Sequence, residues 1–252
     1  MAVSASNVIL LLRSLLFSAG LLLSIGIVAP LVILGFALPF VWRYRISQYC
    51  TRFAIGWLRV TCRIDYRVSG AEHIPDRPVI VMSKHQSTWE TLFLQHYLPP
   101  LAWVVKRELL WVPLFGWALA LLRPIAINRQ ARTSAVRQVI QQGIAHLRQG
   151  QWVLIFPEGT RVAPGVRQRY GTGGAVLAVR GGVPILPVAH NAGEFWPRGG
   201  FLKRPGTVQV VFGPLIASEG CSAQALNHQV EEWIEGTVAR LGPTAPAPKS
   251  PD

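Results

Sequence analysis

A histidine and a carboxylate stand five positions apart in the stretch MSKHQSTWET, as His85 and Glu90. The apolar run 78–82 precedes them, so we expect both side chains where a strand ends and a helix begins. Glu90 can then fold back onto one imidazole nitrogen, fix the tautomer and leave the other nitrogen as a general base. A helix cap beside a surface charge is the alternative, and the pair alone does not exclude it.

A second group of polar residues follows the apolar run 152–156, in the stretch WVLIFPEGTR. Glu158 could bind a substrate hydroxyl, Gly159 lets the backbone approach a ligand, and Arg161 can hold a phosphate with its planar guanidinium. A turn closed by a Glu–Arg ion pair is the structural alternative. Two strand ends that both carry such groups favour a catalytic site more than either stretch alone.

Together these stretches resemble the motifs of the glycerolipid acyltransferase family, in particular its bacterial 1-acylglycerol-3-phosphate members. The resemblance covers residues 79–188. The family's His-x4-acid motif is matched by His85 and Glu90, with Glu in place of the commoner Asp, and its FPEGTR motif is matched in full. The stretches PIAINR and VPILPVAHN match the second and fourth motifs.

The resemblance implies a role for each matched residue. His85 takes the proton from a glycerol hydroxyl as that oxygen attacks a thioester carbonyl, and Glu90 stabilises the imidazolium that forms. Arginines of the second and third motifs hold the phosphate of the acceptor and so position its hydroxyl. The implied substrate-binding residues are Arg129, Glu158, Gly159, Thr160 and Arg161.

The implied reaction transfers an acyl group from acyl-CoA or acyl-ACP (acyl carrier protein) to the sn-2 hydroxyl of 1-acylglycerol-3-phosphate (lysophosphatidic acid), giving phosphatidic acid. A thiol leaving group with a pKa near ~8.5 departs readily, so the chemistry needs no covalent acyl-enzyme. We therefore expect no metal and no cofactor other than the thioester co-substrate. Another lysolipid, such as a lyso-ornithine lipid, is the alternative acceptor.

The N-terminal sequence indicates a membrane anchor, which suits lipid substrates. Residues 14–42 carry no charge, and this run is too long for the core of a signal peptide. As one helix it would measure about 44 Å against a hydrocarbon thickness of ~30 Å, so either a tilted single span or a helical hairpin is expected. Residues 43–67 then carry six arginines and one aspartate, which places this side, and the active site, at the cytoplasmic face of the inner membrane.

After an anchor at 1–45, residues 46–241 show the pattern of an α/β domain. Strands alternating with helices predict a mostly parallel sheet flanked by helices on both faces. The segment 109–122 is uncharged with two tryptophans, which suits either a core helix or a helix at the membrane interface. A helix is expected at 131–149 and a disordered Pro-rich tail at 242–252. The expected strands lie at 78–82, 102–105, 124–127, 152–156, 184–189 and 208–212.

Composition leaves two other classes of protein to consider. The net charge of +13 favours anionic partners, but no nucleic-acid-binding fingerprint accompanies it, so we expect no nucleic acid partner. A non-catalytic membrane scaffold would explain the anchor, yet not the polar groups at the strand ends. Three cysteines without C-x-x-C spacing suggest neither a disulfide framework nor a zinc site.

Overall fold

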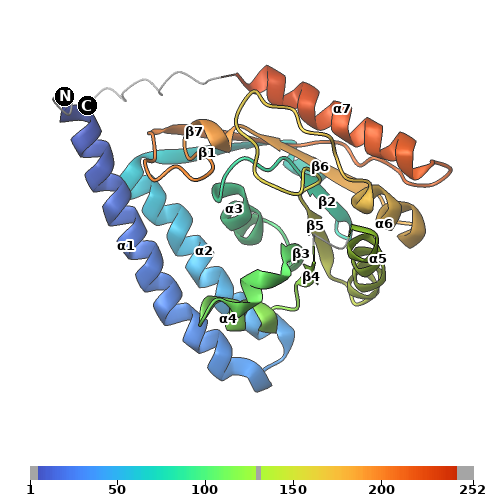
Figure 1. Cartoon of the computed structure of the whole chain (residues 1–252), viewed down its shortest axis with the longest axis horizontal. Coiled ribbons are helices and arrows are strands. Elements are labelled where there is room, and N and C mark those ends of the chain that lie inside the picture. Colours follow the sequence, from blue (N-terminus) through green and yellow to red (C-terminus); the bar gives the residue numbers. More distant parts are fainter. Residues whose placement is uncertain (1–4, 129–131, 243–252) are drawn as a thin grey trace.

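A seven-stranded sheet forms the centre of the computed structural model, which describes residues 5–128 and 132–242 (Figure 1). The strand order is β1-β7-β6-β2-β5-β3-β4, and among these described strands only the β6–β7 pair is antiparallel. The predicted mostly parallel sheet flanked by helices is therefore confirmed. The strands are β1 (Ile64–Ser69), β2 (Ile80–Ser83), β3 (Leu101–Lys106), β4 (Ile125–Ile127), β5 (Trp152–Ile155), β6 (Ile185–His190) and β7 (Gly206–Phe212).

Helices cover both faces of this sheet (Figure 1). Successive side chains of a strand point to opposite faces. Val81 of β2 accordingly packs in a cluster with Phe93 of α3, while Met82 packs with Leu177 of α6 and Ile234 of α7. The α-helices are α1 (Ala5–Leu34), α2 (Phe40–Cys62), α3 (Trp89–Tyr97), α4 (Phe115–Leu121), α5 (Arg132–Arg148), α6 (Gly173–Gly181) and α7 (Ala223–Leu241).

The N-terminal segment forms two helices that lie side by side, α1 and α2 (Figure 1). A short 3₁₀ turn, η1 (Gly35–Ala37), and Pro39 separate them, whereas Pro30 is accommodated inside α1. By length and composition, the segment Asn7–Ala37 is long and apolar enough to cross a membrane. The domain boundary predicted at residue 45 falls inside α2, which continues into the α/β domain.

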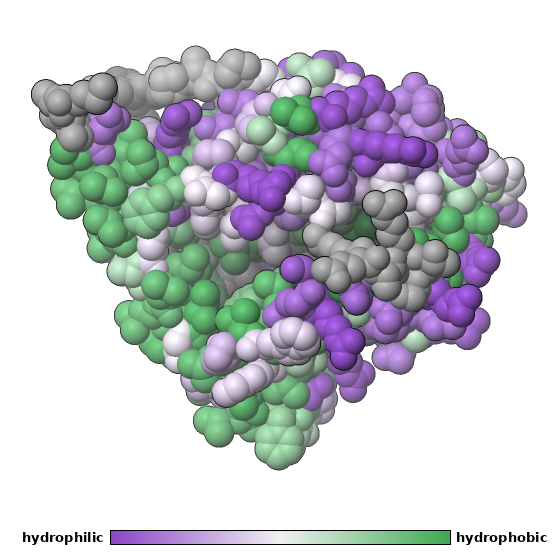
Figure 2. Space-filling view, in the orientation of Figure 1, coloured by the Kyte–Doolittle hydropathy of each residue, from purple (hydrophilic) through white to green (hydrophobic). Residues whose placement is uncertain are grey.

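One face of α1 is apolar and exposed, while the other packs against the protein. Leu22, Leu23 and Leu34 are each more than 60% exposed, whereas Phe17 and Val32 are buried. Figure 2 shows apolar residues gathered over α1, α2 and α4, with polar residues over the opposite part of this face. So large a continuous apolar surface is typical of a membrane-binding protein.

The predicted segment 109–122 forms a 3₁₀ helix, η3 (Arg107–Trp111), followed by α4. Trp111 and Trp117 are 68% and 53% exposed, while Ala118 and Leu122 are buried. Since α4 packs beside α1, these exposed aromatic rings extend the apolar face of α1. This arrangement favours the membrane-interface alternative for the segment.

Candidate active site

Glu90 folds back from the first turn of α3 onto the loop that follows β2. Its Oε1 accepts a hydrogen bond from His85 Nδ1 at 2.8 Å. The same oxygen accepts the backbone N–H groups of Gln86 at 2.9 Å and Ser87 at 2.8 Å. Because a carboxylate only accepts, the imidazole must donate from Nδ1, and its Nε2 is left to take a proton.

The ring of His85 is fixed from a second side by Phe156, directly after β5. The two rings stack with centroids 3.9 Å apart and an interplanar angle of 13°. β2 and β5 are neighbouring parallel strands, so the residues that follow them meet at the same edge of the sheet. The side chain of His85 is 15% exposed and lines a cavity, which leaves it accessible to a substrate.

A second histidine, His190 at the end of β6, lies beside Glu90. Its Nδ1 accepts the Ala192 N–H at 3.2 Å, so its Nε2 carries the proton and donates to the Lys84 carbonyl at 2.8 Å. This Nε2 is 4.0 Å from Glu90 Oε2. Burial lowers the pKa of His190 and keeps the ring neutral.

Glu90 is held as an anion in a buried site. Burial by itself would raise the pKa of this carboxyl, but the hydrogen bonds from His85 and from the Ser87 N–H lower it below its ordinary value. Among the described residues, no donor lies within hydrogen-bond distance of Oε2. One oxygen therefore accepts three hydrogen bonds while the other faces His190, and the negative charge lies next to the His85 imidazole.

Glu158 has its carboxylate buried beneath the loop that follows β2 and carries His85. Oε1 accepts the backbone N–H of His85 at 3.3 Å and lies 3.3 Å from Lys84 Nζ. Burial raises the pKa of Glu158 to about 7, although Lys84 opposes the shift. These contacts hold the backbone of His85, and a direct bond from Glu158 to the substrate stays a prediction.

Arg161 is half-buried at the edge of the same site. Its Nη1 donates to Thr88 Oγ1 at 2.7 Å, and Thr88 lines the cavity together with His85. A further guanidinium, which the sequence did not single out, belongs to Arg198: its Nη1 donates to the Arg161 carbonyl at 2.9 Å. Two arginines thus meet at this edge of the site, and a guanidinium is suited to bind an anionic group.

The remaining predicted binding residues fall at or beyond the edge of this arrangement. Gly159 has φ +68°, in the left-handed region that glycine adopts without strain. Thr160 next to it is half-buried. Arg129, the predicted phosphate ligand of the second motif, lies outside the described residues.

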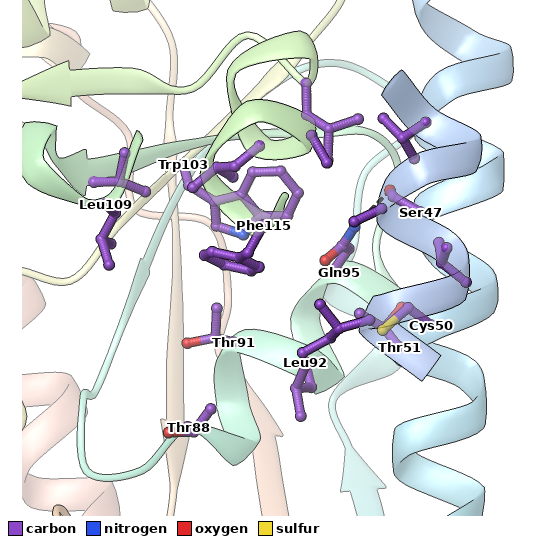
Figure 3. Close-up of a pocket in the computed structure, with 18 of the residues that line it drawn as sticks. Ser47, Cys50, Thr51, Thr88, Thr91, Leu92, Gln95, Trp103, Leu109 and Phe115 are labelled. Carbon is purple, nitrogen blue, oxygen red and sulfur yellow. Dashed lines mark hydrogen bonds between the residues drawn. The ribbon is translucent and has the colours of Figure 1, made fainter. Parts of the chain in front are cut away.

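The cavity next to His85 has a volume of about 320 Å³ and a mainly apolar wall drawn from α1, α2, α3, β3, η3 and α4. Figure 3 shows Trp103 and Phe115 facing the cavity from one side and α2 residues from the other. The few polar groups include Ser47 and Gln95, which hydrogen-bond to each other at 2.8 Å. Such a wall suits a hydrocarbon chain better than a charged headgroup.

Comparisons with known proteins agree on one group. A family model described as Acyltransferase matches residues 65–191. A 1-acyl-sn-glycerol-3-phosphate acyltransferase of Pseudomonas aeruginosa is 51% identical to this chain over 211 residues, which is 82% of each chain. A 1-acyl-sn-glycerol-3-phosphate acyltransferase of Saccharomyces cerevisiae is 28% identical, over 84% of this chain and 72% of its own length. The crystal structure of the 1-acyl-sn-glycerophosphate (LPA) acyltransferase PlsC from Thermotoga maritima has a TM-score of 0.79 at 26% identity, over 93% of this chain and 97% of its own.

Proposed function

The chain belongs to the acyltransferase family, and from that premise we propose that it transfers an acyl group from a thioester donor to the sn-2 hydroxyl of 1-acylglycerol-3-phosphate. The product is phosphatidic acid. The observation that carries the proposal is the His85 imidazole, oriented by Glu90, at the wall of an apolar cavity with Arg161 nearby. A base, an acyl-chain site and a phosphate ligand are the three parts that this reaction needs.

In the proposed mechanism, Nε2 of His85 removes the proton from the acceptor hydroxyl as its oxygen attacks the thioester carbonyl. The negative charge of Glu90 stabilises the imidazolium that results. The tetrahedral intermediate then collapses: the C–S bond breaks, the ester remains, and the imidazolium can return its proton to the thiolate. We propose that no metal or organic cofactor takes part, since a thiolate is a good leaving group.

Arg161 and Arg129 bind the acceptor phosphate in this proposal, and the apolar cavity holds a fatty acyl chain. Both contacts act away from the reacting atoms and bring the hydroxyl and the thioester together. Ser87 is not needed as a nucleophile, because its Oγ accepts the Trp89 N–H at 3.1 Å within the turn before α3.

A thioester-release assay tests the activity and defines both substrates. Membranes containing the chain receive acyl-CoA or acyl-ACP, with lysophosphatidic acid, a lyso-ornithine lipid or no acceptor. We expect thiol release that depends on lysophosphatidic acid, with phosphatidic acid as the lipid product. Release that depends only on the lyso-ornithine lipid would assign the alternative acceptor, and no acceptor-dependent release would contradict an acyltransferase.

Replacing Arg161 by alanine is expected to lower kcat/KM for lysophosphatidic acid by about tenfold to a hundredfold, or ~1.4 to 3 kcal/mol for a charge-assisted contact. Arg129→Ala should act similarly but more on KM. Arg161→Lys should retain part of the activity, because it keeps the charge and loses the planar fork. Steady-state kinetics measure the effect, with Arg180→Ala on exposed α6 surface as the control.

The phosphate assignment has a sharper check in an acceptor that lacks the phosphate. With 1-acylglycerol, the parent and Arg161→Ala should differ by less than about twofold, because the lost contact has no partner there. An equal loss on both acceptors would mean that Arg161 supports the loop structure and not phosphate binding.

We further propose that α1 lies in the cytoplasmic leaflet of the inner membrane, with the active site on the cytoplasmic side. Packing of α1 along α2 supports this placement, since only its exposed apolar face is then free to meet lipid. The exposed tryptophans of η3 and α4 suit the same interface. Residues of α1, η3 and α4 also line the cavity next to His85, so a lipid chain bound there would lie close to this apolar face.

This placement predicts that the chain stays in the membrane fraction through washes with 1 M salt and alkaline carbonate. Apolar burial is not screened by salt, unlike attraction to headgroups. The double variant Leu22→Asp/Leu23→Asp should be released to a large extent, because it places two charges on the exposed face of α1. Val179→Asp on α6 is the control, and release of the parent by salt alone would contradict the proposal.

A further inference from the structure

A buried cluster of charged residues lies behind the catalytic loop and has no part in the mechanism above. We call it the Lys84 cluster: Lys84, Glu158, Tyr170 and Glu235. Lys84 Nζ is 2.7 Å from Glu235 Oε1 and 3.3 Å from Glu158 Oε1, and the Tyr170 hydroxyl donates to Glu235 at 2.8 Å. The side chains of Lys84 and Glu158 are 1% and 0% exposed, and that of Glu235 is 12% exposed.

This cluster connects helix α7 to the residue that precedes the general base. The main chain of Lys84 is fixed to the sheet, because its N–H donates to the Val188 carbonyl at 3.0 Å and its carbonyl accepts from His190. Its side chain reaches Glu235 on α7, and Glu158 joins the same ammonium to the His85 N–H. The backbone N–H of His85 is therefore linked, through Glu158, to the same buried ammonium that Glu235 contacts.

We propose that Lys84 and Glu235 are positioning residues for the acyl transfer, and that α7 thereby holds His85 in register with its substrates. The inference rests on the proposed function. Two carboxylates share one cation in this cluster, and Glu235 is the nearer partner. Glu235 thus limits how closely Lys84 approaches Glu158, and so sets where the His85 N–H is held.

Packing of α7 does not explain the burial of these charges. Leu226, Val230 and Ile234 of α7 already pack in the apolar core on that face of the sheet. A buried ion pair is weak evidence for stability, because desolvation offsets most of its attraction. One turn earlier, Glu231 forms an ion pair with Arg167, whose side chain is 57% exposed, and this pair supplies a matched comparison on the same helix.

The experiment compares Glu235→Gln with Glu231→Gln in the full-length, membrane-inserted chain, with turnover divided by the amount of folded protein. We expect Glu235→Gln to lower kcat about tenfold and to leave KM for lysophosphatidic acid within about twofold, because the base shifts while the binding groups remain. Glu231→Gln should match the parent in both constants. Thermal unfolding of each variant measures any effect on stability separately.

A double variant tests whether the two residues act through one contact. Lys84→Met should lower kcat at least as much as Glu235→Gln, because it leaves two buried carboxylates without their cation. Adding Glu235→Gln to Lys84→Met should lower kcat no further. If Glu235→Gln does not fold, Tyr170→Phe, which removes only one donor to Glu235, should lower kcat about threefold.

Parental kcat per folded molecule in Glu235→Gln, or in Tyr170→Phe where that variant is needed, would overturn the inference. An equal loss in Glu231→Gln, or a change confined to KM, would do the same. Turnover of the parent with lysophosphatidic acid tests the proposed function on its own. A failure of the inference is therefore distinguishable from a failure of the function.

Discussion

Replacing His85 by alanine is expected to lower kcat by at least about a hundredfold, with KM for lysophosphatidic acid changed little. The acceptor hydroxyl then loses the base that takes its proton, and general-base catalysis contributes typically 10²–10⁴-fold. The Arg161 guanidinium and the rest of the cavity wall remain in place when the imidazole is removed, so substrate binding should persist. Loss of rate without loss of binding identifies a group that acts mainly in the transition state.

The measurement is initial-rate kinetics on membrane-inserted protein, with His228→Ala as the control for removal of a histidine. His228 is on α7, and its side chain is 66% exposed. It should retain parental turnover. His85→Ala with a kcat within a few-fold of the parent would mean that the imidazole is not the base and that the His85–Glu90 contact is structural.

Much of the fold was predictable because the sheet is covered on both sides. Buried strands read as short apolar runs, and six such runs coincide with β2 to β7. β1 was missed because IDYRVS alternates polar and apolar residues at the sheet edge, and its arginine and aspartate were counted with the basic flank of the anchor. β7 runs antiparallel to β6 and parallel to β1, and local pattern does not specify which strands pair or in which direction.

The site was predictable where its contacts are local. A histidine and a glutamate five residues apart, at a strand end and a helix start, can meet through one turn of chain, as His85 and Glu90 do. His190 was not singled out because it reaches this pair only through the adjacency of β6 and β2, more than 100 positions apart in sequence. Glu235 had no signal either, since its pattern on α7 is that of a surface charge.

The direction of the Glu158 side chain could also not be predicted from the sequence. The motif that contains Glu158 indicated a polar group at a strand end, and both a cavity-facing and an inward-facing carboxylate satisfy that pattern. The direction depends on Lys84, whose buried ammonium attracts the carboxylate beneath the loop. A buried charge without a partner is unfavourable, so the Lys84 ammonium draws the Glu158 carboxylate inward. Motif spacing alone does not specify that direction.

Glu90→Gln is expected to lower kcat by about a hundredfold, or ~2.7 kcal/mol, while the protein keeps its fold. The Gln86 and Ser87 N–H groups require an acceptor at the Oε1 position, so the amide oxygen must take that place. The oxygen can still accept from His85 Nδ1, and the tautomer is retained. The variant removes only the negative charge beside the imidazolium. It therefore measures the contribution of that charge to kcat separately from the orientation of the imidazole ring.

Two further variants complete this argument. Glu90→Asp keeps the charge but is one methylene shorter, so it should lose at least one of the three hydrogen bonds to Oε1 and retain an intermediate kcat. Because His85 and Glu90 act as a unit, the double variant His85→Ala/Glu90→Gln should be little slower than His85→Ala alone. Near-parental turnover in Glu90→Gln would show that the carboxylate only closes the loop before α3. Additive losses in the double variant would show that Glu90 acts on the reaction independently of the imidazole.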